Sequence, residues 1–400
     1  MQLTRALACA LLAAVPGIAS AGGNVEAAST VFHESGGPLH MTVVNPSVTA
    51  DVALADALSL QAGWEADVVT GASVAVVDAP GDVDAITSAT RVEDVRHVAH
   101  AGLRLGDPDA AIEARYAYGF ERDYRSHALS LRASTELFDH NTTLSVGYAR
   151  GWDALCDLLQ PEAERAVQRQ RLPSGDGCFA KDRGRTDHAI ALHTLDGAWT
   201  QAWTPIFNTQ WSVSTQLVSG FQSNPYRAVW LGRAAAQEHH PRERARYATT
   251  LAARLWIRPL GGALALSAQL YRDSWDVRAM AYELGFERAL GAHLRLRLRG
   301  RYYRQSGAAF FSDDYGLAPK GAYFTGDREL SPLDDWLFGV RLEAAPFAGS
   351  AGRWPRLREG LRCIGKLDGL MHVFRAFHYG EEAVPNRRAV IATLALDLRY

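Results

Sequence analysis

The chain has 400 residues, enough for two average domains or one large barrel. Hydrophobic residues make up 48% and charged residues 22%, which excludes an intrinsically disordered chain. The formal net charge of −2 is not the basic excess that nucleic-acid binding requires, and no later apolar run approaches the roughly 20 residues of a membrane-spanning helix.

The first 21 residues resemble a secretory signal peptide. Arg5 supplies a positive n-region, residues 6–15 are the apolar segment, and Ala19-Ser20-Ala21 is an A-x-A cleavage site. We therefore expect an exported protein with a mature part at 22–400. An exported protein without a helical anchor is either soluble outside the inner membrane or a barrel in the outer membrane of a Gram-negative bacterium.

Three cysteines follow the signal segment: Cys156, Cys178 and Cys363. The first two bracket one polar loop, and an oxidising compartment permits a disulfide there. A bridge between Cys156 and Cys178 and three unpaired thiols both remain open. Cys363 has no evident partner.

A period of two in hydrophobicity recurs along the chain from residue 28 to the end. Such alternation predicts β-strands with one apolar and one polar face. We expect a bulge near His193, where the alternation weakens. The sixteen expected strands are 28–34, 47–54, 58–70, 96–105, 112–120, 129–137, 142–152, 189–199, 210–217, 247–257, 264–270, 282–287, 292–304, 336–344, 366–378 and 390–400.

The clearest alternation lies in residues 292–304, AHLRLRLRGRYYR. Leu294, Leu296 and Leu298 share one parity, and a row of four arginines occupies the other: Arg295, Arg297, Arg299 and Arg301. In a soluble sandwich the leucines would pack on a second sheet. In a transmembrane barrel they would meet lipid, and the arginines would line a hydrated lumen.

The connections favour the barrel over a secreted soluble β-protein. Tight turns at 55–57, 106–109, 138–141, 203–205, 258–262 and 289–291 alternate with long polar loops at 72–91, 154–186, 221–243 and 307–333. Tryptophans lie near strand ends, as in interfacial belts, and the last strand ends at Tyr400. We predict an all-β fold, a transmembrane antiparallel β-barrel of about 16 strands with short periplasmic turns and long extracellular loops. Its partners would be outer-membrane lipid and, through Tyr400, the barrel-insertion machinery.

Several segments together resemble the bacterial "domain of unknown function 3570" family, from about residue 30 to the end. They are an ESGG turn, GASVAVVDA, GYARGWD, NPYRAV, PRERAR, YRDSWDVRA, RYYRQSGAAFFSDD and DRELS, beginning at residues 34, 71, 147, 224, 241, 271, 301 and 327. The resemblance implies an outer-membrane β-barrel and no particular activity. It also implies neighbours among envelope proteins that handle redox equivalents or metals.

The arginine row is the candidate functional site. Arg295, Arg297, Arg299 and Arg301 would draw anions into a pore, since clustered charge in a low-dielectric wall focuses the field. The same arginines would also pair with Glu283 and Glu287 on the preceding strand, as cross-strand partners do. Both roles are compatible.

Other chemistry is not indicated by the sequence. No G-x-S-x-G, H-E-x-x-H, P-loop or C-x-x-C motif is present, and nothing activates Ser130 or His127 as a catalytic pair. Adjacent histidines on a strand face opposite ways, so we interpret His239 and His240 as solvated loop residues rather than metal ligands. We predict no enzyme, metal or cofactor.

We expect a porin-like channel for small polar or anionic solutes. The alternative is a closed barrel that acts as scaffold or receptor for an envelope redox or metal-handling system. A monomer and a trimer are both compatible with the sequence.

Overall fold

The computed structural model describes residues 22–36, 40–72, 91–107, 109–121, 123–158, 185–224, 228–231, 235–315, 321–347, 360–379, 382–383 and 386–400. The predicted signal peptide, Cys178, most of the GASVAVVDA segment and half of the NPYRAV segment lie outside these residues. No helix among them has the length and apolarity to cross a membrane.

Sixteen antiparallel strands form a closed barrel, as the alternation predicted. The first nine are β1 (Gly23–Ser35), β2 (Met41–Ala55), β3 (Leu58–Ala72), β4 (Arg91–Gly106), β5 (Ala110–Phe120), β6 (Tyr124–Leu137), β7 (Thr142–Leu158), β8 (Arg185–Thr204) and β9 (Phe207–Gly220). The others are β12 (Glu243–Ile257), β13 (Gly262–Asp273), β14 (Arg278–Leu290), β15 (Leu294–Gln305), β16 (Leu333–Ala344), β17 (Leu361–Phe374) and β20 (Arg387–Arg399).

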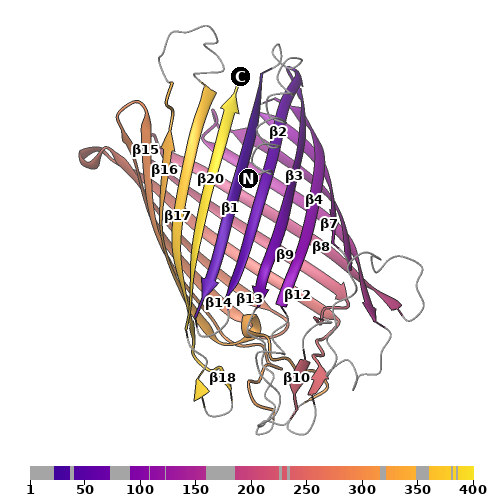
Figure 1. Cartoon of the computed structure of the whole chain (residues 1–400). Helices are drawn as coiled ribbons and strands as arrows, with labels where there is room; N and C mark the ends of the chain where they lie inside the picture. Colours follow the sequence, from indigo (N-terminus) through magenta and orange to yellow (C-terminus); the bar gives the residue numbers. More distant parts are fainter. Residues whose placement is uncertain are drawn as a thin grey trace.

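The barrel closes where the first strand meets the last (Figure 1). β1 pairs with β20 from Asn24 opposite Arg399 to Ser35 opposite Arg388. The backbone N–H of Gly23 donates to the Tyr400 carbonyl at 3.1 Å, and the Tyr400 N–H donates back at 3.1 Å. Closure leaves no open edge, which is the requirement for strands that cross a bilayer.

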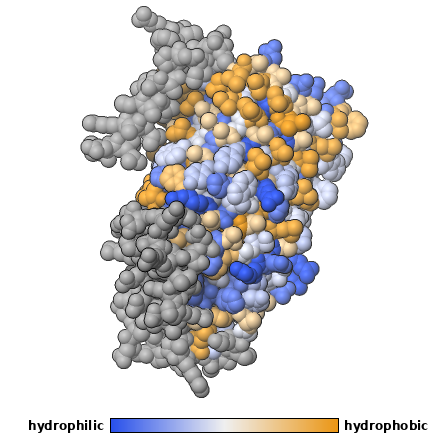
Figure 2. Space-filling view, turned by 90° about the vertical axis from the view of Figure 1, so that its right-hand side faces the viewer, coloured by the Kyte–Doolittle hydropathy of each residue, from blue (hydrophilic) through white to orange (hydrophobic). Residues whose placement is uncertain are grey.

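Apolar side chains cover the outside of the barrel. Leu298 is 46% exposed, Phe338 64% and Leu394 73%, all on the parity opposite the ionic residues. Orange patches mark such apolar residues over the side of the barrel drawn in Figure 2. A soluble sandwich would have hidden these leucines, so their exposure fits a face that meets hydrocarbon.

The two ends of the barrel differ in their connections. At the turn end, where Gly23 and Tyr400 lie, the connections 56–57, 107–109, 138–141, 205–206, 258–261 and 291–293 are tight, and 345–360 is longer. At the loop end, 73–90, 159–184, 221–242, 306–332 and 375–386 are long. The loop end also has short links at 36–40, 121–123 and 274–277, so the alternation of short and long connections is less regular than predicted.

Several strand predictions need correction. β1 begins at Gly23 rather than at residue 28, because its apolar and small residues continue the ladder with β2 and β20. No bulge occurs near His193, which pairs in register with Arg150 and Leu217. The irregularity of β8 lies between Ala202 and Thr204. β17 starts at Leu361 and ends at Phe374, whereas the predicted strand spanned 366–378.

The buried apolar clusters lie beneath the loops at the loop end. One holds Trp275, Val277, Ala308 and Leu330, and another holds Val229, Tyr315 and Phe324. The loops add two hairpins, β10 (Ala228–Trp230) with β11 (Ala235–Gln237) and β18 (His378–Tyr379) with β19 (Glu382–Ala383), and the 3-10 turn η2 (Arg328–Leu330). A second 3-10 turn, η1 (Arg258–Leu260), belongs to the turn end.

The structure excludes the alternative of three unpaired thiols. Cys156 is disulfide-bonded and fully buried near the end of β7. Cys363, on β17, is a free thiol. The predicted partner of Cys156, Cys178, lies outside the described residues.

Candidate functional site

The arginine row lies on the inward face of β15. Cross-strand register places Arg301 opposite Glu283 and Arg297 opposite Glu287 on β14. On the other side, Arg299 stands opposite Gly339 of β16, beyond which lies Asp368 of β17. The predicted site residues therefore share one wall of the lumen, because the period of two sends all of them to the same face.

The ion pairs along this wall are mostly diagonal. A guanidinium nitrogen of Arg295 lies 3.7 Å from Glu287, and one of Arg297 lies 3.7 Å from Glu283. Arg299 reaches past Gly339 and binds Asp368 with both ends of its fork, at 3.0 and 2.8 Å. Since Asp368 is 1% exposed, Arg299 acts as a structural partner, and a Cβ at Gly339 would collide with that carboxylate.

Sequence reasoning missed Asp368 and Lys366, which extend this network of ion pairs. Lys366 also pairs with Asp368, at 3.0 Å, and Glu343 on β16 accepts a 2.7 Å hydrogen bond from Arg362. Lys366 and Asp368 share a parity within GKLDG, but sequence alone did not indicate that Arg299 crosses a whole strand to reach Asp368.

Arg301 differs from the other arginines of the row. No carboxylate oxygen of the described residues lies within 4.0 Å of it, because Glu283 leans towards Arg297. Its guanidinium carbon lies 5.8 Å from the centre of the Tyr303 ring. A cation without a counter-ion makes the local potential of the lumen wall positive.

Arg301 lines a cavity of about 570 Å³ beneath η2, at the loop end of the lumen. Ionisable and apolar groups share this cavity: His372 and Asp335, hydrogen-bonded at 2.6 Å, lie on the same wall as Leu337 and Leu370. The arrangement offers one free positive charge beside an apolar surface.

A buried ion cluster fastens η2 over this cavity. Arg328 donates to both oxygens of Glu34 on β1, at 2.7 and 3.0 Å, and Arg387 on β20 donates to Glu34 at 3.0 Å. The Glu34 and Arg387 side chains are each 1% exposed. The cluster joins the 306–332 loop to the seam where the barrel closes, so the loop is held across the mouth.

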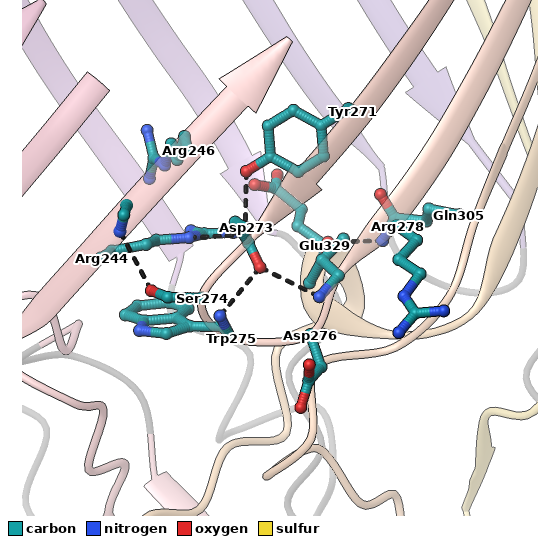
Figure 3. A network of polar contacts seen from close by, with 12 residues as sticks. Arg244, Arg246, Tyr271, Asp273, Ser274, Trp275, Asp276, Arg278, Gln305 and Glu329 are labelled. Carbon is teal, nitrogen blue, oxygen red and sulfur yellow. Dashed lines mark hydrogen bonds and ion pairs between the residues drawn. The ribbon is translucent and has the colours of Figure 1, made fainter. Parts of the chain in front are cut away.

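A second polar network holds the β13–β14 turn (Figure 3). Asp273 accepts from Arg244 Nε and from the Tyr271 hydroxyl, both at 2.8 Å, and from the backbone N–H groups of Trp275 and Val277 at 3.0 and 2.9 Å. The Arg244 guanidinium lies 4.1 Å from the Trp275 ring centre. These contacts satisfy a carboxylate that is fully buried.

The 221–242 and 306–332 loops meet through buried polar groups. Glu238 accepts from the Thr325 hydroxyl at 2.9 Å and from the Asn224 N–H at 2.7 Å. The Tyr315 hydroxyl accepts from the Thr325 N–H at 2.9 Å, and burial raises the pKa of Tyr315. The loops therefore pack as a folded cap with its own interior.

The interpretation of His240 as a solvated residue is wrong. His240 is 5% exposed, and its ring packs against Trp275 and Phe310, whereas His239 remains exposed. Within the part of the chain that the structure describes, no group of three or more potential metal ligands comes together.

The family described as "Protein of unknown function (DUF3570)" matches residues 3–349. The chain belongs to this family. The ESGG, DRELS, PRERAR and YRDSWDVRA segments, which carried the resemblance in sequence, contribute Glu34, Arg328, Arg244 and Asp273 to the two networks at the loop end. In this DUF3570 member those segments are therefore structural clamps of the barrel mouth.

Solved structures that align with the chain over most of its length are distant in sequence. A "bacterial polysaccharide outer membrane secretin" aligns over 94% of this chain and 98% of its own, with 9% identity and a TM-score of 0.50. Pseudomonas aeruginosa OpdK with vanillate aligns over 96% and 100%, with 8% identity and a TM-score of 0.45. Pseudomonas aeruginosa OccK2 (OpdF) aligns over 95% and 98%, with 10% identity and a TM-score of 0.42. No curated protein sequence matches the chain.

Proposed function

We propose that this DUF3570 protein is an outer-membrane channel that passes small polar solutes and prefers anions. A barrel of sixteen strands is wide enough to enclose an aqueous channel unless loops fill it. Its inward parity is polar and its outward parity is apolar, which suits a lumen with water inside and lipid outside.

The segregation of charge around the lumen wall carries the proposal. No lysine or arginine occurs in residues 22–72, so β1, β2 and β3 present only acidic charges to the lumen. Among the described residues, none of their carboxylates at Glu26, Asp51, Glu65 and Asp67 has an ion-pair partner within 4.0 Å. The wall of β15 to β17 carries the arginine row with the unpaired Arg301. Only β20 separates the two groups of strands, so the acidic and cationic charges lie on neighbouring parts of the lumen wall, and the field between them orients a charged solute.

Planar-bilayer recording of the refolded protein is the direct test. Stepwise conductance is expected, and its absence would remove the channel. Arg301→Glu and Arg297→Glu should each move the reversal potential in a salt gradient towards cation preference, because each reverses a lumen charge. Arg288→Glu is the matched control, since Arg288 points outward on the same hairpin. An unchanged reversal potential in both lumen variants would exclude the arginine row as the selectivity element.

The folded cap favours one second candidate, a closed barrel that serves as receptor or scaffold. Its loops bury Glu238, Thr325 and Tyr315 in an interior of their own, which is unusual for loops that only border an open pore. A stable partner that co-purifies with a non-conducting barrel would support this candidate against the channel.

A further inference from the structure

Four arginines gather on the outer surface of the barrel at the loop end. Arg272 of β13 and Arg278 of β14 stand directly opposite each other, and both are exposed. No carboxylate among the described residues lies within 4.0 Å of either. Arg304 and Arg375 share the single carboxylate of Asp334, at 3.7 and 3.3 Å. Like charges opposed across strands are destabilising, so a ligand that neutralises them would stabilise the barrel.

A row of aromatic side chains shows where these four arginines lie relative to the membrane. Tyr282, Tyr302 and Trp336 occupy one row across β14, β15 and β16, with 4.5 Å between the Tyr302 and Trp336 ring centres. Aromatic rows of this kind lie at the membrane–water interface. Arg304 lies two residues beyond Tyr302, which is about 6.7 Å towards the loop end. The arginines are therefore at head-group height, where an outward charge costs little.

A cavity of about 630 Å³ connects the four guanidinium groups with apolar surface. Arg272, Arg278, Arg304 and Arg375 line it, together with Leu270 and Met280. Leu270 and Met280 are paired across the strands and are 57% and 39% exposed, on the side nearer the aromatic row. The Arg278 guanidinium points away from the network around Asp273, as Figure 3 shows. The cavity thus offers cations above and hydrocarbon contacts below.

We infer that this cavity binds the phosphorylated head group of an outer-leaflet glycolipid, with an acyl chain against Leu270 and Met280. Guanidinium forks match phosphate oxygens in charge and in bidentate geometry. The apolar floor at membrane depth selects a lipid over a free phosphate, because a free ion gains nothing from Leu270 and Met280. The inference rests on the proposed outer-membrane location and does not require the lumen to conduct.

The test is titration of the full refolded protein in detergent with diphosphorylated lipid A, followed by native mass spectrometry. Arg272→Gln/Arg278→Gln should weaken lipid binding by about tenfold or more, since two charge-assisted contacts are lost. The lipid affinity of Arg278→Lys should lie between that of the wild type and that of the double variant, because lysine keeps the positive charge and lacks the bidentate guanidinium. Arg258→Gln/Arg288→Gln, which removes two exposed arginines from the turn end, should bind as the wild type does.

The double variant should fold, because it removes a repulsive pair, and a heat-dependent shift in gel mobility verifies this before the titration. Equal lipid A binding by the double variant and the wild type would overturn the site. Displacement of the lipid by excess inorganic phosphate would show a free-anion site and overturn the lipid as occupant, and equal binding of phosphatidylcholine would overturn the recognition of phosphate charge. Failure to insert into vesicles would refute the membrane location and this site together, whereas loss of conductance alone would refute only the channel.

Discussion

Arg328→Gln should release the loop that lies across the barrel mouth while leaving the barrel intact. Arg328 contributes two hydrogen bonds to Glu34, at 2.7 and 3.0 Å, and its side chain is 12% exposed. Breaking a buried ion pair costs about 3–5 kcal/mol. Glu34 keeps Arg387, and Gln305 still donates to the carbonyls of Glu329 and Ser331, so we expect the lower end, about 3 kcal/mol.

A loss of about 3 kcal/mol corresponds to an increase of roughly 100-fold in the population of the released loop. The Leu330 and Ser331 amides report on it, because both donate hydrogen bonds within η2, at 2.9 and 3.1 Å. Their hydrogen exchange, measured by mass spectrometry on the refolded protein, should accelerate by about that factor. Arg362→Gln is the control, since it removes a lumen ion pair at the turn end. Unchanged exchange at Leu330 and Ser331 in Arg328→Gln would refute the anchoring role of the Glu34 cluster.

Three further expectations follow from other parts of the barrel. Asp273→Asn should lower stability by about 3 kcal/mol, because Arg244 loses a buried carboxylate; the thermal shift in gel mobility measures this against exposed Asp276→Asn, and equal midpoints would contradict it. Leu298→Arg should cost about 2–4 kcal/mol in vesicle unfolding, whereas Ser214→Arg, which faces the lumen, should cost little, and the reverse order would invert the assignment of faces. The hydrogen bond to Glu136 and the nearby Asp109 raise the pKa of His140. The contact therefore stabilises the folded barrel at low pH, and this stabilisation is lost as the pH rises through the raised pKa. An NMR titration midpoint of His140 that stays the same in Glu136→Gln would count against it.

The described strands show which features of the fold the alternation of hydrophobicity predicts. Alternation in 292–304 predicted which side of β15 carries leucine and which carries arginine, since side chains on a strand must alternate. The same reasoning predicted the number of strands and the closure between the first and the last. It was wrong about the start of β1, because small residues such as Ala27 alternate too weakly to mark a strand. It was also wrong about the bulge near His193, where the pairing with both neighbouring strands stays in register.

The sequence by itself determined the faces of the strands and the positions of the tight turns, because both depend on residues within about ten positions of one another. Only the tertiary structure decided which charges of the lumen are free. Glu283 stands opposite Arg301 and yet leans to Arg297, while Arg299 crosses to Asp368, so that Arg301 alone of the row lacks a carboxylate among the described residues. Arg328 and Glu34 are 294 residues apart, and they meet because barrel closure and loop folding bring distant segments to one mouth. Contacts of that range depend on the path of the whole chain, which no local pattern encodes.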